Sequence, residues 1–208
     1  MQLLLTDRLT CPRCGPEFGL ILLANELVER RVMDGALGCP NCRDSFEIIS
    51  GFADLRPPPR GALDPGRSGS EPVEADEVQR LAALLGVVGG PGTVALVGRP
   101  ARYAAPLADM VEGVEFVAVD SDAREWPERP GVSRMVAGPP LPFFSRVLRG
   151  VVLDGTLGDE SIREAGRVVA PRSRMVVVDA PPGCAEHLEA AGLTVLAEEG
   201  ETVVAARG

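Results

Sequence analysis

Short apolar runs alternate with helical patterns in the C-terminal two thirds of the chain. Residues 93–97 form a β-branched run typical of a strand buried on both faces, and Gly98 follows it. Residues 101–112 carry apolar side chains at helical spacing, and residues 114–119 form a second apolar run that ends at Asp120. This pattern is the first half of a nucleotide-binding βαβ unit, with an acid about 20 residues past the turn.

The same alternation continues to the C-terminus. Further strands are predicted at 133–136, 151–154 and 174–179, and helices at 71–85, 159–169 and 183–191. Residues 193–197 and 202–206 read as a closing antiparallel hairpin. Strands that alternate with helices imply a parallel sheet with right-handed crossovers. We therefore predict an α/β fold, with a small β-rich segment followed by a Rossmann-like, mostly parallel sheet that ends in an antiparallel hairpin.

The N-terminal segment contains two C-x2-C pairs in hairpin-like sequence. The pairs are Cys11 with Cys14 and Cys39 with Cys42. Between them we predict strands at 18–23 and 27–33, with turns at 24–25 and 34–35, and a third strand follows at 45–49.

These four cysteines have the spacing of a closed metal site. Two such pairs that face each other give a tetrahedral set of four thiolates, which suits zinc and leaves no open position for chemistry. Two disulfides or an iron–sulfur site are the alternatives. Metal binding contributes on the order of 10 kcal/mol or more, which allows so short a segment to fold. We therefore predict a structural zinc ion bound by Cys11, Cys14, Cys39 and Cys42.

Composition divides the chain. Residues 57–70 are first rich in proline and then in glycine and serine, which predicts a stiff, extended part and a flexible part. We expect a zinc-ribbon domain at 1–56, this linker at 57–70, and a Rossmann-like domain at 71–208.

Charge and residue usage exclude several functions. The net charge is −9, which argues against a protein that mainly grips a phosphate backbone, and aromatic residues make up 4% of the chain. All 21 basic residues are arginine, so no lysine can serve as a base or form a Schiff base. No stretch approaches the ~20 apolar residues of a membrane span, and the N-terminus lacks the pattern of a secretory signal. We expect a cytoplasmic protein with reduced thiols and no membrane contact.

The N-terminal quarter resembles a known family. The resemblance rests on a leading Leu-rich turn, the two cysteine pairs and a trailing apolar motif: Leu3-Leu4-x-x-Asp7-x-Leu9-x-Cys11-Pro-x-Cys14, Cys39-Pro-x-Cys42 and Phe46-x-Ile48-x-x-Gly51-Phe52-x-x-Leu55. It is similar to the zinc-ribbon family that serves as the activating subunit of tRNA, ribosomal-RNA and release-factor methyltransferases. In that family the ribbon lends a strand edge and apolar surface to a methyltransferase, so the resemblance implies a partner domain nearby.

The remainder resembles a class I S-adenosylmethionine-dependent methyltransferase. The resemblance rests on the strands that end at Gly98, Asp120, Asp154 and Asp179 and on the final hairpin. It implies that Gly98 lies at the cofactor and that Asp120 holds its ribose. The alternative for Asp120 is an exposed carboxylate at a strand end.

Two positions depart from that family's pattern. The next two glycine positions of the cofactor loop fall on Pro100, which lacks an amide proton, and on Arg102, which adds a long side chain. The acid that often contacts the adenine is missing near Ala137-Gly138. We therefore expect a non-catalytic scaffold or partner-binding pseudoenzyme with a protein partner. The alternatives are an active methyltransferase acting on RNA, protein or a small molecule, and an RNA-binding accessory factor.

Overall fold

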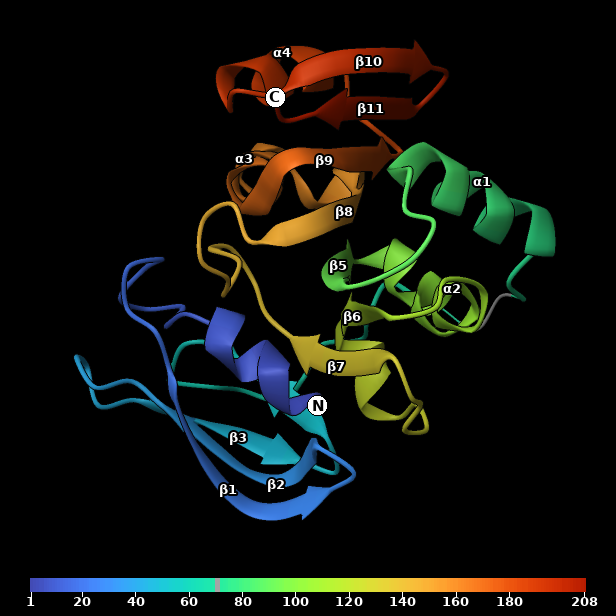
Figure 1. Cartoon of the computed structure of the whole chain (residues 1–208). Helices are drawn as coiled ribbons and strands as arrows, with labels where there is room; N and C mark the ends of the chain where they lie inside the picture. Colours follow the sequence, from blue (N-terminus) through green and yellow to red (C-terminus); the bar gives the residue numbers. More distant parts are fainter. Residues whose placement is uncertain (70–71) are drawn as a thin grey trace.

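The computed structural model describes residues 1–69 and 72–208. The strands in this described part form one sheet of 11 strands in the order β1-β2-β3-β4-β7-β6-β5-β8-β9-β11-β10 (Figure 1). The strands are β1 (Ile21–Val28), β2 (Arg31–Gly38), β3 (Ser45–Ile49), β4 (Phe52–Asp54), β5 (Gly92–Val97), β6 (Val114–Val119), β7 (Val132–Val136), β8 (Leu148–Asp154), β9 (Val169–Val178), β10 (Thr194–Glu199) and β11 (Thr202–Ala206). The helices are α1 (Ala75–Leu85), α2 (Ala104–Met110), α3 (Asp159–Val168) and α4 (Cys184–Ala190), with 3-10 turns η1 (Leu3–Arg8), η2 (Arg99–Tyr103), η3 (Ser121–Arg124) and η4 (Gly155–Leu157).

The C-terminal part of the sheet is a Rossmann-like arrangement. Strands β7, β6, β5, β8 and β9 run parallel, β11 pairs antiparallel with β9, and β10 pairs antiparallel with β11. The predicted fold class, including the closing hairpin, is confirmed. Helix α1 also ends as predicted, because Gly86 takes the left-handed conformation and its amide bonds back to Ala82 and Ala83.

The N-terminal strands continue the same sheet. Strands β1 to β4 pair antiparallel in sequence order, and β4 then pairs parallel with β7. The backbone amide of Leu55 extends this pairing by donating to Val136 O at 2.9 Å. The N-terminal segment thus forms one edge of the sheet (Figure 1).

The turn of the first hairpin does not lie where it was predicted. It lies at Glu29 and Arg30, which both have positive φ, as a two-residue type I′ turn requires. The predicted turn at 24–25 is instead a bulge inside β1, where the register shifts between Ala24 and Glu26. The predicted turn at 34–35 is also wrong, since both residues lie within β2. Glycine is needed at Gly35, because a Cβ there would come within 2.5 Å of Leu23 O on the paired strand.

The predicted helix at 101–112 was too long. A 3-10 turn, η2, precedes a short helix, α2. Pro106 lies in the first turn of α2, and it has no amide to donate to the carbonyl four residues earlier. An α-helix therefore cannot continue through this point toward Gly98.

Two apolar cores cover the two faces of the sheet. Side chains of α1 and α2 pack on one face, against Val94 and Leu96 of β5. Side chains of α3 and α4 pack on the other face, against Ala95 and Val97. The alternation along β5 matches the two-residue period of a strand buried on both sides.

The second core extends into the N-terminal segment. Val119 of β6 shares this core with residues from the N-terminal segment, all at most 2% exposed. They are Leu5 of η1, Leu9 directly after it, and Phe46 and Ile48 of β3. The N-terminal segment therefore packs on the sheet that follows it.

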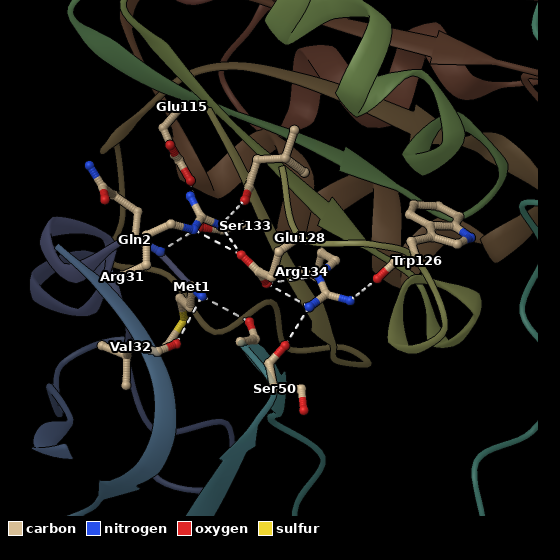
Figure 2. A network of polar contacts seen from close by, with 12 residues as sticks. Met1, Gln2, Arg31, Val32, Ser50, Glu115, Trp126, Glu128, Ser133 and Arg134 are labelled. Carbon is tan, nitrogen blue, oxygen red and sulfur yellow. Dashed lines mark hydrogen bonds and ion pairs between the residues drawn. The ribbon is translucent and has the colours of Figure 1, made fainter. Parts of the chain in front are cut away.

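A partly buried ionic network joins the two parts beside β7 (Figure 2). Glu128 accepts from Arg31 of β2 at 2.8 Å and from Arg134 of β7 at 2.5 Å. Arg134 also donates to the carbonyls of Ser50 and Trp126, and only 4% of its side chain is exposed. One guanidinium thus ties the turn before β4 to the loop before β7.

The network controls the ionisation of Glu128. Burial opposes its negative charge, but the hydrogen bonds from Arg134 and the positive charges of the Met1 amino group and Arg31 outweigh burial and hold the pKa of Glu128 below its usual value. Glu115 lies on the neighbouring strand β6 and bonds to Ser133 Oγ at 2.5 Å, and there burial raises the pKa of Glu115. Ser133 Oγ in turn accepts from the backbone amide of Gln2 (Figure 2).

Candidate functional site

The four cysteines of the two C-x2-C pairs converge on one point. Their Sγ atoms all lie within 4.8 Å of one another, with 3.6 Å between Cys11 and Cys42 and 3.8 Å between Cys14 and Cys39. A zinc ion bonded to four sulfurs at about 2.3 Å would hold them about 3.8 Å apart. The cluster therefore fits a tetrahedral metal ion. The distances are far longer than the roughly 2.05 Å of a disulfide bond.

Local hydrogen bonds support this sulfur cluster. The amide of Cys14 donates to Cys11 Sγ at 3.4 Å, and Asn41 Nδ2 donates to Cys14 Sγ at 3.3 Å. Such contacts orient metal-bound thiolates and offset their charge. Cys11 and Cys39 are buried in the core shared with the sheet, so the cluster also anchors that core.

A second candidate site lies at the carboxyl ends of the parallel strands. In an open α/β sheet, ligands bind outside these ends, where the strand order reverses. Here the reversal lies between β5 and β8. Gly98 follows β5, Asp120 follows β6 and Asp154 ends β8, so the structure brings together the two residues predicted for the cofactor. The amide of Gly98 bonds to Val119 O at 3.0 Å, which places it beside the end of β6.

The linker crosses this edge and bonds to both predicted residues. The amide of Arg67 donates to Asp120 Oδ2 at 3.0 Å, and Ser68 Oγ donates to Gly98 O at 3.3 Å. Asp122 holds the segment from both sides, because its carboxylate accepts from the amides of Gly66 at 2.9 Å and Gly69 at 3.3 Å. We call residues 66–69 the linker plug.

The linker plug also reaches the end of β8. The Arg67 guanidinium donates to Thr156 Oγ1 at 2.7 Å and lies 4.0 Å from Asp154. Ser68 is fully buried, and its carbonyl accepts from Arg102 at 3.4 Å. The plug thus spans the strand ends on both sides of β5. The prediction of a flexible segment did not anticipate these contacts.

The ionisation of Asp120 reflects its burial under the plug. Asp120 is 7% exposed, so the alternative of an exposed carboxylate is wrong. Burial raises the pKa of Asp120, while the hydrogen bonds from the amides of Arg67 and Asp122 oppose that rise. Both carboxylate oxygens accept from backbone amides, at 2.9 Å from Asp122 and 3.0 Å from Arg67.

In this arrangement the site does not fit a nucleoside. The linker plug lies directly against the carboxylate of Asp120, where both oxygens accept backbone amides, so it occupies the space that a ribose would need. Gly66 lies so close to it that a Cβ would come within 1.9 Å of Asp120 Oδ1. The need for glycine at Gly98 also has a structural reason, since its φ is +75° and a Cβ would come within 2.8 Å of Asp154 Cβ.

An ion pair lies at the next strand end. Arg99 contacts Asp179 beyond β9 in an ion pair, and its amide donates to the fully buried Asp154 at 3.4 Å. The hydrogen bond to Asp179 raises the pKa of Arg99, and burial works against that rise. The charge of Arg99 is therefore paired with a carboxylate of the chain itself.

Sequence reasoning missed Arg67, Ser68 and Asp122 as residues of this edge. Glycine and serine in the linker indicate flexibility, and no local pattern pairs them with acids more than 50 residues away. The pair of acids at the end of a strand, Asp120 and Asp122, was the one sequence feature that could have indicated these contacts. Two neighbouring carboxylates can accept several amide hydrogen bonds from another segment.

Two other reactive side chains lie on α4. Cys184 opens α4, where a helix N-terminus could activate a thiol, but it is 2% exposed and burial raises its pKa to about 11. His187 lies 3.7 Å from Asp159 at the surface of α4. Neither forms part of a catalytic arrangement with Gly98 or Asp120.

Comparisons with known proteins show similarity in fold only. No family model matches the chain, and neither does any curated protein sequence. Among solved structures, the [4+2]-cyclase SpnF is 19% identical with a TM-score of 0.48, covering 61% of this chain and 59% of SpnF, which is less than two thirds of its length.

Two further structures are similar at the same level. A chain of the complex between the Haloferax volcanii Trm112 methyltransferase activator and a predicted methyltransferase is 18% identical with a TM-score of 0.48, covering 58% of this chain and 68% of that one. The N-methyltransferase NodS from Bradyrhizobium japonicum, solved with S-adenosyl-L-homocysteine, is 15% identical with a TM-score of 0.44, covering 67% and 88%. Identities and TM-scores this low do not show that the proteins share an activity.

Helix length bears on membrane contact. In residues 1–69 and 72–208, none of the helices combines the length and apolar character needed to cross a bilayer.

Proposed function

We propose that this chain is a zinc-binding, methyltransferase-like scaffold that does not bind S-adenosylmethionine in the usual way. In this proposal the ribbon is fused in cis to the sheet that it supports, and the linker plug occupies the strand edge where a cofactor would lie. The protein works by presenting surfaces to a protein partner rather than by transferring a methyl group.

The hydrogen bond between Arg67 N and Asp120 Oδ2 is the observation that supports this proposal most. The carboxylate that the resemblance assigns to a ribose is satisfied by the chain itself. Pro100 and Arg102 act in the same direction, since Pro100 offers no amide and Arg102 points its guanidinium at Ser68 O. In this arrangement the chain itself supplies the hydrogen-bond partners of Asp120.

Zinc has a structural role in the proposal. Four thiolates would complete its coordination and leave no position for a substrate or water. The ion would hold the buried Cys11 and Cys39 in the core that also contains the first turn and β3. The domain boundaries at 56 and 70 remain part of the proposal, as does location in the cytoplasm.

An active S-adenosylmethionine-dependent methyltransferase is the second candidate. It is favoured by the position of Gly98 and Asp120 on neighbouring strand ends at the point where strand order reverses. In that case the linker plug would have to leave Asp120 before the cofactor could bind. Transfer of a labelled methyl group to RNA, protein or a small molecule would support this candidate.

Calorimetric titration separates the two candidates. The full zinc-loaded chain is titrated with S-adenosylmethionine and, separately, with S-adenosylhomocysteine. We expect no binding heat for either ligand. Binding in the micromolar range would overturn the proposal and favour the enzyme.

A further inference from the structure

An arginine-lined hollow lies at the opposite end of the sheet from the linker plug. It has a volume of about 680 Å³ and is open to solvent. Its wall consists of the loop before β8, the outer side of α3, the end of α4 and the C-terminal tail. The charged residues that line it are Arg146, Arg163, Glu164, Arg167 and Arg207.

Two of these arginines are held rigidly at the base. Arg207 is 9% exposed and donates to the carbonyls of Val169 at 2.9 Å, Gly166 at 2.7 Å and Ala191 at 3.0 Å. Arg167 donates to Leu141 O and Phe143 O, each at 2.8 Å. These contacts fix both guanidinium groups before any ligand arrives.

The two arginines at the rim have no such partners. Within the described residues, the side chains of Arg146 and Arg163 form no hydrogen bond or ion pair, and both residues are exposed. The single acid of the hollow, Glu164, is already bonded to Arg167 at 2.8 Å. Two cations therefore face the hollow without compensation.

The local charge is opposite to that of the whole chain. Four arginines and one glutamate give the hollow a net charge of +3, whereas the chain has −9. The carbonyls at the ends of α3 and α4 contribute partial negative charge, but Arg207 already caps them. Burial lowers the pKa of Arg207, and the nearby positive charge of Arg146 lowers it further, which indicates unrelieved repulsion.

We propose that this hollow binds a compact, multiply phosphorylated small molecule through Arg146 and Arg163. The planar guanidinium fork matches the oxygens of a phosphate group, and a second phosphate would engage the second rim arginine. Arg167 and Arg207 supply positive charge from below. The site is separate from the cofactor edge, so it does not depend on the proposed function.

The lining argues against a nucleic acid as the ligand. The remaining residues are Ser145, Ala190 and Ala191, so no aromatic ring in the hollow can stack on a base. Its volume suits a ligand of a few tens of atoms rather than an extended strand. The strong negative charge elsewhere on the chain also repels a long polyanion.

Calorimetry with inorganic pyrophosphate as the probe tests the site. The full zinc-loaded chain is titrated in low salt without divalent cations, together with R146A, R163A and the double variant. Each removed guanidinium should weaken pyrophosphate binding about tenfold, in line with the loss of charged hydrogen bonds. R124A is the matched control, because Arg124 is an exposed arginine whose side chain is 57% accessible. It should bind as the unmodified chain does.

Three results would overturn the proposal. One is the absence of binding heat with pyrophosphate. Another is binding that R146A and R163A leave unchanged. The third is a short single-stranded oligoribonucleotide that binds more tightly than pyrophosphate and depends on the same two arginines, since the site would then be a nucleic-acid contact. Both arginines are exposed, and an unchanged melting temperature of the double variant confirms that the fold is retained.

Discussion

The backbone amide of Arg67 lies 3.0 Å from Asp120 Oδ2, across 53 residues of sequence. This bond joins a glycine-rich linker to the acid at the end of β6, and it closes the edge of the sheet where cofactors bind in related folds.

Gly66 should be essential for seating the linker plug. A Cβ at this position would come within 1.9 Å of Asp120 Oδ1, so Gly66→Val must displace the segment. Trypsin should then cut after Arg67 at least about tenfold faster, because the local opening free energy falls. Gly61→Val is the matched control, since a Cβ at Gly61 meets no atom within 4 Å. Equal cleavage rates in the two variants would show that the plug is not seated.

Glu128→Gln should weaken the junction in a pH-dependent way. The pKa of Glu128 is lower in the folded chain than its usual value of 4.5, so its ionised form stabilises the fold above that value. We expect Glu128→Gln to lose about 2 kcal/mol of unfolding free energy at pH 7. The loss should shrink as the pH falls below 4.5 through the folded pKa, because the unmodified chain then becomes protonated too.

Urea denaturation at pH 7 and at acidic pH measures this difference. Glu125→Gln serves as the control, because Glu125 has an 87% exposed side chain and only a 4.0 Å contact to Arg124. It should change stability by less than about 0.5 kcal/mol. A difference between Glu128→Gln and the unmodified chain that stays constant with pH would contradict the ionic account of the junction.

Phe46→Ala should destabilise the whole molecule rather than the ribbon alone. Phe46 is fully buried in the core that also includes Val119 of β6, so its truncation should cost about 3–5 kcal/mol. Trp126 is the one tryptophan of the chain and packs against the other apolar core, so its fluorescence reports on a different core from the one that contains Phe46. We expect the fluorescence to report a single unfolding transition at a lower temperature than in the unmodified chain. Val88→Ala, at a 94% exposed residue, should leave it unchanged. A Trp126 transition that Phe46→Ala does not move would mean that the two parts unfold independently.

Cys39→Ser should remove the metal. We expect metal analysis to fall from one zinc ion per chain to none, with a lower melting temperature, because the ion contributes folding free energy. Cys184→Ala is the control, because this buried cysteine lies outside the cluster and should leave the metal content unchanged. Zinc retained in Cys39→Ser would contradict a four-cysteine site.

Cys184 should also resist alkylation in the folded protein. Burial raises its pKa to about 11, so almost none of it is thiolate at neutral pH. Mass spectrometry after treatment with iodoacetamide should find Cys184 unmodified until the chain is denatured. Fast modification of the folded chain would show that α4 opens readily.

Periodicity predicted the elements of the sheet well. The buried runs at β5, β6, β8 and β9 are β-branched and apolar, and such strands need no distant information to be recognised. The hairpin turn at Glu29 and Arg30 was missed because neither residue is typical of a turn with positive φ. The short α2 was overextended because the apolar spacing hides the effect of Pro106.

The candidate site was only half predictable. Spacing alone identified the four cysteines and placed Gly98 and Asp120 at adjacent strand ends, since both features are local. The linker plug depends on amides that meet carboxylates more than 50 residues away, and composition indicates only flexibility there. The pairing of β4 with β7 is likewise a tertiary contact that periodicity could not predict, and the family resemblance implied only that the ribbon offers a strand edge to a domain nearby.

Hydrogen exchange at the Arg67 amide tests the central claim most directly. Measured by NMR on the full zinc-loaded chain, this amide should be strongly protected, because it donates to the buried Asp120, and excess S-adenosylmethionine should leave its exchange rate unchanged. Rapid exchange without ligand, or loss of protection when S-adenosylmethionine is added, would contradict a chain that closes its own cofactor site.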